Sequence, residues 1–386
     1  MIGKVTHKAV QATFLTTIFF LIFYIAISAE DPTSTPNAGT TTLQVNVPAA
    51  GNQTCSAELD ALLMTELRDT SGIDPALSAA ERAPKIIRVR KDGSGEFKSV
   101  TDALKSIPAG NTVRTIISIG PGTYNEKIRV DRNKPFVTFM GTDPNSKPIL
   151  AYSSMAAQSG GTWNSAATAV ESEYFMAANI VFQNTAPKPT GKKNDGEQAV
   201  AMRISGDKAA FYNCRFISFQ DTLCDDVGNH FFENCYVEGT VDFVFGTGKS
   251  LYLYTALHSV GDGFGAVTAS GRGVKDDDSA GFTFVHCKIT GSGNLYLGRT
   301  WKNQAKIVFA YTEMDGHINP AGWINDKPGL REDTMFYGEY KCSGPGSSTG
   351  KRATYAKLLT DAEAKPFLDK SYIKVEYPMG AMEAVD

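Results

Sequence analysis

The sequence predicts an all-β fold: a single-stranded, right-handed parallel β-helix with short capping helices. The segment Phe211–Cys214 recurs 21 residues later as Phe232–Cys235, each ending in Asn-Cys. A repeat of about 20 to 50 residues is typical of a solenoid, in which equivalent positions of successive coils stack. From Arg114 onward, short β-rich runs alternate with turn residues, and no long helical pattern separates them. This excludes βαβ winding, which needs crossover helices. The recurring spacing favours a β-helix over the alternative, a flat antiparallel sandwich.

Residues 1–29 have the three parts of a secretory signal peptide. Lys4 and Lys8 precede the apolar run Phe14–Ile27, and small residues follow it. A membrane anchor is the alternative interpretation, because the run approaches the length of a short spanning helix. No later segment is comparably apolar, so we expect cleavage near residue 29, a secreted product and no membrane association afterwards.

Residues 30–84 are predicted to form a linker and an N-terminal helix. The stretch 31–54 is rich in Pro, Gly and Thr and contains the glycosylation acceptor Asn52. Leucines recur at helical spacing between Ser56 and Arg68, which indicates one amphipathic helix. Residues 85–386 are then left as one catalytic domain.

Within this domain we expect few helices. Ser99 can cap a helix that continues through Ile107 until Pro108 ends it. Such a helix at the start of a solenoid usually caps its open end. Thr360–Glu363 is a capping box that opens a helix on the outside of the coils. The β-rich runs predict strands at residues 115–119, 137–139, 178–182, 210–212, 230–232, 282–285 and 306–309.

Charge and cysteine content restrict the classes of partner. The formal charge is −3 for 386 residues, and loss of residues 1–29 takes it to about −5, which argues against a nucleic-acid partner. Six cysteines are too few for a disulfide scaffold. The repeat places Cys214 and Cys235 in one column, where a disulfide and a pair of free buried thiols are equally compatible with the spacing. Five scattered histidines show no metal-ligand spacing, so no metal is expected.

Asp221 and Asp242 each lie seven residues after Cys214 and Cys235, respectively. Stacked strands are about 4.8 Å apart, so the two carboxylates should be neighbours. Two carboxylates that close cannot both ionise easily, and one pKa rises while the other stays low. Either aspartate alone could simply cap backbone groups in a turn, but the pair in register indicates an acid beside an ionised carboxylate.

Four motifs carry a resemblance to a known family. They are Gln198–Ala201, Gln220–Leu223, Gly239–Gly246 and Leu297–Trp301. In these motifs and in their order the sequence closely resembles the plant pectinesterases, also called pectin methylesterases, from about Lys85 to the C-terminus. The resemblance implies a pectin-lyase-like solenoid in the form that lacks the family's N-terminal inhibitor-like domain.

The resemblance assigns roles to five residues. It implies that Asp242 is the nucleophile and that Asp221 is the acid, later the base that activates water. A guanidinium forked onto Asp242 would hold that carboxylate ionised, which is the role expected of Arg299. Gln220 and Gln198 are uncharged amide donors, suited to an oxyanion.

Other positions are expected to contact substrate. Trp301 follows Arg299 by two residues on an expected strand and would offer a flat apolar face to a sugar ring; burial in the core is the alternative. By resemblance, Thr162 also contacts substrate. Thr300 stands where many family members carry proline, which should make the turn less rigid.

The expected function is hydrolysis of C6 methyl esters of homogalacturonan to pectate and methanol, in cell wall modification and pectin catabolism. The expected protein is a secreted, extracellular monomer of the cell wall that acts on methyl-esterified pectin, needs no cofactor and can meet a proteinaceous inhibitor. A β-helix glycosidase acting on galacturonan and a non-catalytic wall-binding protein are the alternatives.

Overall fold

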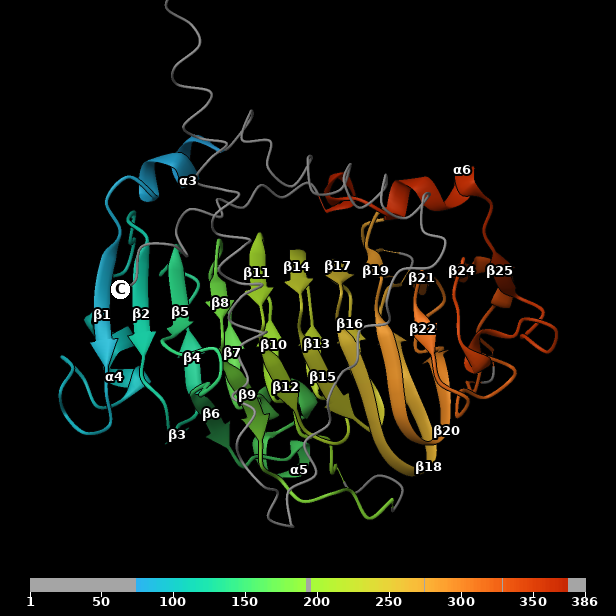
Figure 1. Cartoon of the computed structure of the whole chain (residues 1–386), viewed down its shortest axis with the longest axis horizontal. Coiled ribbons are helices and arrows are strands. Elements are labelled where there is room, and N and C mark those ends of the chain that lie inside the picture. Colours follow the sequence, from blue (N-terminus) through green and yellow to red (C-terminus); the bar gives the residue numbers. More distant parts are fainter. Residues whose placement is uncertain (1–73, 192–195, 274, 328, 374–386) are drawn as a thin grey trace, which may run out of the picture. The chain divides into compact units, whose positions relative to one another are not determined.

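The chain winds into stacked coils of parallel strands (Figure 1). The structure is a computed structural model that describes residues 74–191, 196–273, 275–327 and 329–373. Strands separated by one coil pair in parallel from the first described coil to the last. The predicted right-handed parallel β-helix is therefore confirmed, and the antiparallel sandwich is excluded.

The first sheet runs the length of the coils in sequence order, as Figure 1 shows from β1 to β25. Its strands are β1 (Lys85–Val89), β2 (Thr115–Ile119), β5 (Val137–Gly141), β8 (Met176–Ala178), β11 (Ala209–Tyr212), β14 (Asn229–Glu233), β17 (Lys249–Leu253), β19 (Gly281–Val285), β21 (Lys306–Ala310), β24 (Phe336–Tyr340) and β25 (Ala356–Leu358).

The second sheet has two arms that meet at the long strand β18, which pairs with both β15 and β16. One arm contains β3 (Thr123–Asn125), β6 (Ile149–Tyr152), β9 (Val181–Asn184), β12 (Arg215–Ile217) and β15 (Tyr236–Gly239). The other contains β4 (Ile128–Val130), β7 (Thr168–Val170), β10 (Met202–Ile204), β13 (Leu223–Asp225) and β16 (Val241–Gly246). Beyond β18 (Ala256–Ser270) lie β20 (Lys288–Arg299), β22 (Glu313–Met314) and β23 (Trp323–Ile324).

One predicted strand, residues 178–182, is wrong. The structure divides it into β8, which ends at Ala178, and β9, which begins at Val181. Asn179 between them has φ 58°, a left-handed conformation that asparagine tolerates and that turns the chain from one sheet to the next. Asn213 and Asn234 adopt the same conformation one and two coils later, with φ 50° and 51°. The repeated Asn-Cys signature therefore marks a corner of the coil.

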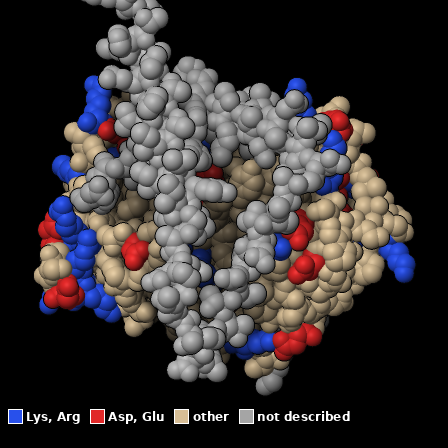
Figure 2. All heavy atoms as spheres, in the orientation of Figure 1, with Lys and Arg blue, Asp and Glu red and all other residues tan. Residues whose placement is uncertain are grey.

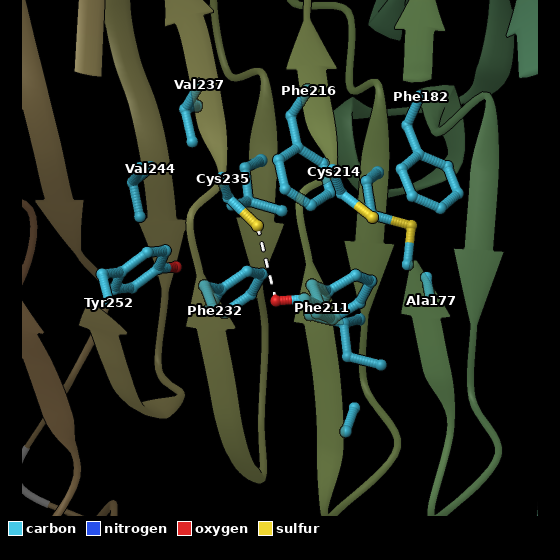
Figure 3. Packing of buried hydrophobic residues seen from close by; sticks show 14 of the residues in the cluster. Ala177, Phe182, Phe211, Cys214, Phe216, Phe232, Cys235, Val237, Val244 and Tyr252 are labelled. Atoms are coloured by element: carbon cyan, nitrogen blue, oxygen red, sulfur yellow. Dashed lines mark hydrogen bonds between the residues drawn. The ribbon is translucent and has the colours of Figure 1, made fainter. Parts of the chain in front are cut away.

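Aromatic rings stack through the interior of the coils (Figure 3). The ring of Phe232 lies 4.8 Å from that of Phe211 and 4.4 Å from that of Tyr252, nearly parallel to both. Cys214 and Cys235 follow the asparagine corners, point into the same core and are free thiols. The Sγ of Cys235 donates to the Phe211 carbonyl at 3.4 Å. The spacing allowed either a disulfide or two free thiols, and the structure has the free thiols.

Short helices cover parts of the coils. Helix α4 (Val100–Ser106) is capped by the Ser99 side chain, as predicted, and buries Val100 and Leu104 in the core at the first coils. Helix α6 (Asp361–Ala364) begins with the predicted capping box and packs Ala364 against the outside of the first sheet. Helices α3 (Pro75–Ala80) and α5 (Ala156–Ser159) were not predicted. The expected signal peptide, the glycosylation acceptor Asn52 and the expected helix at residues 56–68 lie outside the described residues.

Charged side chains of both signs are interspersed over the visible part of the face in Figure 2. Near the first coils, for example, Arg88 pairs with Glu96 at 3.8 Å and Lys105 with Asp102 at 2.9 Å. Water screens exposed pairs of this kind, so they contribute little to stability. In the part of the chain that the structure describes, no helix has the length and apolar character needed to cross a membrane.

Candidate active site

Asp221 and Asp242 occupy equivalent positions of adjacent coils. Strand β13 pairs with β16 so that Leu223 lies opposite Val244, a shift of 21 residues that also aligns the two aspartates. The backbone N–H of Asp221 donates to the Val241 carbonyl at 3.0 Å. Both aspartates have positive φ, 62° and 53°. Such conformations persist only where the surroundings enforce them, and they are common at functional sites.

Arg299 reaches the same place from the end of β20. Its Nε donates to Oδ1 of Asp242 at 2.6 Å, and one terminal nitrogen donates to Oδ2 of the same carboxylate. The other terminal nitrogen donates to Oδ2 of Asp326 at 3.0 Å. The forked geometry expected for Arg299 and Asp242 is therefore present, with a second carboxylate that the sequence did not indicate.

Gly298 allows this approach. A Cβ atom at position 298 would lie 2.4 Å from Oγ1 of Thr268 and 3.0 Å from the ring of Trp323. The backbone N–H of Thr300, where many family members have proline, donates to the Ile324 carbonyl at 3.0 Å. Because proline has no such donor, this chain secures the turn after Arg299 by a hydrogen bond rather than by a ring.

The surroundings of the two carboxyl groups are unequal. Burial raises the pKa of Asp221 well above its usual range, and the neighbouring Asp242 charge raises it further; Arg299 and a hydrogen bond from Gln220 oppose this. Burial also raises the pKa of Asp242 above its usual range, but by less than that of Asp221, because hydrogen bonds from Arg299 and its charge oppose the rise. Among the described residues, Oδ1 of Asp221 has no hydrogen-bond partner. The pair therefore favours one shared negative charge, held on Asp242 by Arg299, with the proton on Asp221.

Gln220 and Gln198 lie on adjacent coils beside the aspartates. Gln220 directly precedes Asp221, and its carbonyl accepts from the Ala199 N–H at 3.1 Å. The Gln198 carbonyl accepts from Ala156 at 2.8 Å. Both side chains are partly exposed, so their amides are accessible for hydrogen bonding. The spacing of one coil that was predicted for the two glutamines is confirmed by this backbone pairing.

An apolar cluster lies under the site on the outward face of the second sheet. We call it the outer cluster; it consists of Ala166, Ala169, Val200, Cys224, Phe245 and Ala269. Phe243, by contrast, belongs to the interior core, as expected from its position next to Asp242. The ring of Trp301 lies 6.0 Å from that of Phe245, a member of the outer cluster.

Trp301 is 37% exposed, so its burial in the core, the alternative considered from the sequence, is wrong. The strand expected to carry it is also wrong, since β20 ends at Arg299 and Trp301 lies in the following bend. The partly exposed indole provides a flat apolar surface close to Arg299.

Thr162 begins a short 3-10 helix, η1 (Thr162–Ser165), in the segment before β7. Its neighbour Trp163 was not singled out from the sequence, although it is 48% exposed. The Trp163 ring stacks on the guanidinium of Arg203 at 3.6 Å. Arg203 lies opposite Cys224 in the pairing of β10 with β13, so Trp163 lies about one coil from the aspartates. The position of Trp163 next to Thr162, within the motif Gly161–Ser165, is the signal that could have identified Trp163 from the sequence.

The fork between Arg299 and Asp242 leads to a first prediction. In Arg299→Lys the charge remains, but a single ammonium cannot hold both oxygens of Asp242 and contact Asp326 as well. We expect kcat/KM for the ester hydrolysis expected from the sequence to fall about 100-fold, with the acid limb of the pH profile, which reports the ionisation of Asp242, moved to higher pH. Steady-state kinetics over a range of pH measure both. An unchanged pH profile would contradict the assignment of Arg299 to the ionisation of Asp242.

Comparisons with known proteins agree on one family. A family model described as Pectinesterase matches residues 86–376. Pectinesterase 2 of Olea europaea is 52% identical over 294 residues, which cover 76% of this chain and 79% of the relative. The solved structure of pectin methylesterase from carrot superposes with a TM-score of 0.72 at 31% identity and covers 79% of this chain and 98% of that one. Pectin methylesterase PemA from Erwinia chrysanthemi superposes with a TM-score of 0.66 at 26% identity, covering 76% and 98%.

Proposed function

The chain belongs to the pectinesterase family, and we propose that Asp242 and Asp221 carry out its hydrolysis of pectin methyl esters. The reaction converts the C6 methyl ester of a galacturonan unit to a carboxylate and releases methanol. One observation supports the assignment above others: of two stacked, buried carboxyl groups, only Asp242 receives the forked guanidinium of Arg299. Ester hydrolysis needs such an unequal pair, one group as nucleophile and one as proton donor.

In the first half of the proposed reaction, a carboxylate oxygen of Asp242 attacks the ester carbonyl carbon. Negative charge then develops on the former carbonyl oxygen, and the amide N–H groups of Gln220 and Gln198 stabilise it. As the tetrahedral intermediate collapses, the bond to the methoxy oxygen breaks and Asp221 gives that oxygen its proton. Methanol leaves, and the sugar is bound to Asp242 as an acyl-enzyme.

In the second half, Asp221 is ionised and acts as a base. It takes a proton from a water molecule, whose oxygen attacks the acyl carbon and releases the Asp242 carboxylate. Asp221 is protonated again and the pair returns to its starting charge. Trp301 and Thr162 are proposed to hold the sugar ring during both halves, since the exposed indole of Trp301 lies beside Arg299.

One assay tests the reaction class. Methyl-esterified pectin is incubated with the protein, and methanol and new reducing ends are measured in the same samples. An esterase releases methanol and leaves the number of reducing ends unchanged, whereas the alternative glycosidase produces reducing ends. Reducing ends without methanol would overturn the proposed chemistry. The absence of both products would support the wall-binding alternative.

We also propose that the protein is secreted to the cell wall and acts there as a monomer. The signal-like composition of residues 1–29 supports secretion, and the substrate is a wall polysaccharide. A proteinaceous inhibitor remains a predicted partner. N-terminal sequencing of the secreted protein tests the cleavage near residue 29, and its elution in size-exclusion chromatography tests the monomer.

A further inference from the structure

Glu339 is a buried carboxylate that takes no part in the proposed reaction. It lies on β24 and is 3% exposed. Its Oε1 accepts from the indole N–H of Trp323 at 3.0 Å. The Nε of Arg352 donates to the same oxygen at 2.9 Å, and one terminal nitrogen of Arg352 donates to Oε2 at 3.0 Å. Desolvation of two charges can exceed their mutual attraction, so a buried ion pair is weak evidence for stability and points to a role in fixing geometry.

Glu339 and Arg352 hold the short strand β23 from two sides. Glu339 binds the side chain of Trp323, and Arg352 packs against the residue before it. A Cβ atom at Gly322 would lie 2.6–3.2 Å from three atoms of the Arg352 side chain. The Trp323 ring stacks on that of Tyr337, with 4.4 Å between the ring centres and 7° between the planes. The indole is therefore held both at its polar edge and on its face.

Strand β23 in turn holds the end of β20, which carries Arg299. The backbone N–H of Leu297 donates to the Gly322 carbonyl at 2.7 Å. The backbone N–H of Thr300 donates to the Ile324 carbonyl at 3.0 Å. These two hydrogen bonds lie on either side of Arg299 and fix its backbone to β23.

The side chain of Arg299 depends on the same segment. Asp326 follows β23 by two residues and accepts from Arg299 at 3.0 Å. The backbone of Arg299 and the second carboxylate that binds its guanidinium are thus both placed by β23. A displacement of about 1 Å at such a group can reduce the rate about 100-fold, even when its cause lies far from the chemistry.

We propose that Glu339 is a positioning residue for Arg299 and acts through Trp323. This inference rests on the proposed function, because Arg299 is important there as the partner of the nucleophile Asp242. In the part of the chain that the structure describes, Glu339 makes no hydrogen bond to Arg299 or Asp242. Its carboxylate, with Arg352 as counter-ion, holds the indole, and the indole holds β23 beside β20. The guanidinium of Arg299 is thereby kept in line with both oxygens of Asp242.

A loosened fork has a defined effect on Asp242. Hydrogen bonds from Arg299 and its charge oppose the rise that burial causes in the pKa of Asp242. When Trp323 loses the carboxylate that holds it, the fork weakens and the pKa of Asp242 rises further. The acid limb in the pH profile of kcat/KM, which reports the ionised nucleophile, should then move to higher pH. The charged groups around Asp242, all of which the test leaves unchanged, are Asp221, Arg299, Asp326 and Lys327.

The test compares Trp323→Phe and Glu339→Gln with the wild type by steady-state kinetics of methanol release from methyl-esterified pectin over a range of pH. Phenylalanine keeps a flat ring against Tyr337 but has no N–H for Glu339, whose pair with Arg352 remains. Glutamine removes the charge that holds Arg352 and so binds the indole less firmly. In each variant we expect kcat to fall about 10-fold with KM little changed, and the acid limb to move to higher pH.

A double variant and a matched control test the route. If Glu339 acts through Trp323, adding Glu339→Gln to Trp323→Phe should move the acid limb no further than Trp323→Phe alone. Glu313→Gln is the control, because it removes an exposed carboxylate from β22, which also pairs with β20 but at Lys288. We expect this control to keep the wild-type kcat and pH profile.

Thermal unfolding establishes which variants are folded, because Glu339→Gln leaves the buried charge of Arg352 without a carboxylate. If that variant does not fold, Trp323→Phe, which retains the ion pair, decides the test. A variant that is only less stable loses folded protein, and with it apparent kcat, but its acid limb stays in place.

An unmoved acid limb in folded Trp323→Phe would overturn the positioning role of Glu339. Additive shifts in the double variant, or an equal shift in Glu313→Gln, would overturn it as well. Failure of the wild-type protein to release methanol would instead overturn the proposed function.

Discussion

Replacing Asp242 by asparagine is expected to abolish methanol release from methyl-esterified pectin, with kcat reduced on the order of 10⁴-fold or more. The asparagine side chain has nearly the same shape, so the left-handed backbone at position 242, with φ 53°, is retained. A neutral amide, however, has no carboxylate oxygen to attack the ester and form the acyl-enzyme. Arg299 keeps its contact with Asp326 in the variant and so remains near the site.

Asp326→Asn is the matched control for this experiment. It removes the second carboxylate that pairs with Arg299 and makes the same change in charge, but it leaves the proposed nucleophile in place. We expect the rate of methanol release to fall about 10-fold, because Arg299 is held less firmly although both of its hydrogen bonds to Asp242 persist. Methanol release by initial rates and the melting temperature are measured for both variants. If folded Asp242→Asn were as active as Asp326→Asn, Asp242 could not be the nucleophile.

The fold was predictable because its signals are local and periodic. The 21-residue repeat of Asn-Cys reflects a left-handed corner at Asn213 and Asn234, which lies at the same place in successive coils. The caps of α4 and α6 follow from single polar side chains at Ser99 and Thr360. The break at Asn179 was missed because only Asn179 and Ile180 separate the two strands, and the apolar pattern continues through them. Such a short corner leaves little trace in hydrophobic periodicity.

The sequence predicted those site residues whose positions follow from the stacking of successive coils. Asp221 and Asp242 share one column because strand register is constant across β13 and β16. Asp326 and Trp163 could not be found in the same way. They reach the site from segments outside the repeat, one after β23 and one before β7, so their approach depends on how the coils stack in three dimensions. The sequence could not decide whether Cys214 and Cys235 were joined, because the column holds free thiols equally well.

Asp221→Asn should have two opposite effects, a loss of activity and a gain in stability near neutral pH. Without a proton donor for departing methanol and a base for water, kcat is expected to fall about 10²–10⁴-fold. Stability should change because burial and the Asp242 charge raise the pKa of Asp221 in the folded protein. A carboxyl group with a raised folded pKa contributes its stability below the unfolded pKa of about 3.9 and loses it progressively as pH rises toward the folded pKa. Asparagine does not titrate, so the variant escapes this loss.

The free energy of unfolding therefore tests whether Asp221 is the carboxyl group of the pair that destabilises the folded protein near neutral pH. At pH 7 the variant should be more stable than the wild type by about 0.5–2 kcal/mol, the range common when a functional site is relieved of an unfavourable group. The difference should shrink as pH falls toward 4, since both proteins then carry a neutral side chain at position 221. Asp262→Asn, at an exposed position, should change stability by less than about 0.5 kcal/mol at either pH. A gain that is independent of pH, or a variant less stable than wild type at pH 7, would show that Asp221 is ionised at rest and that the proton assignment within the pair is wrong.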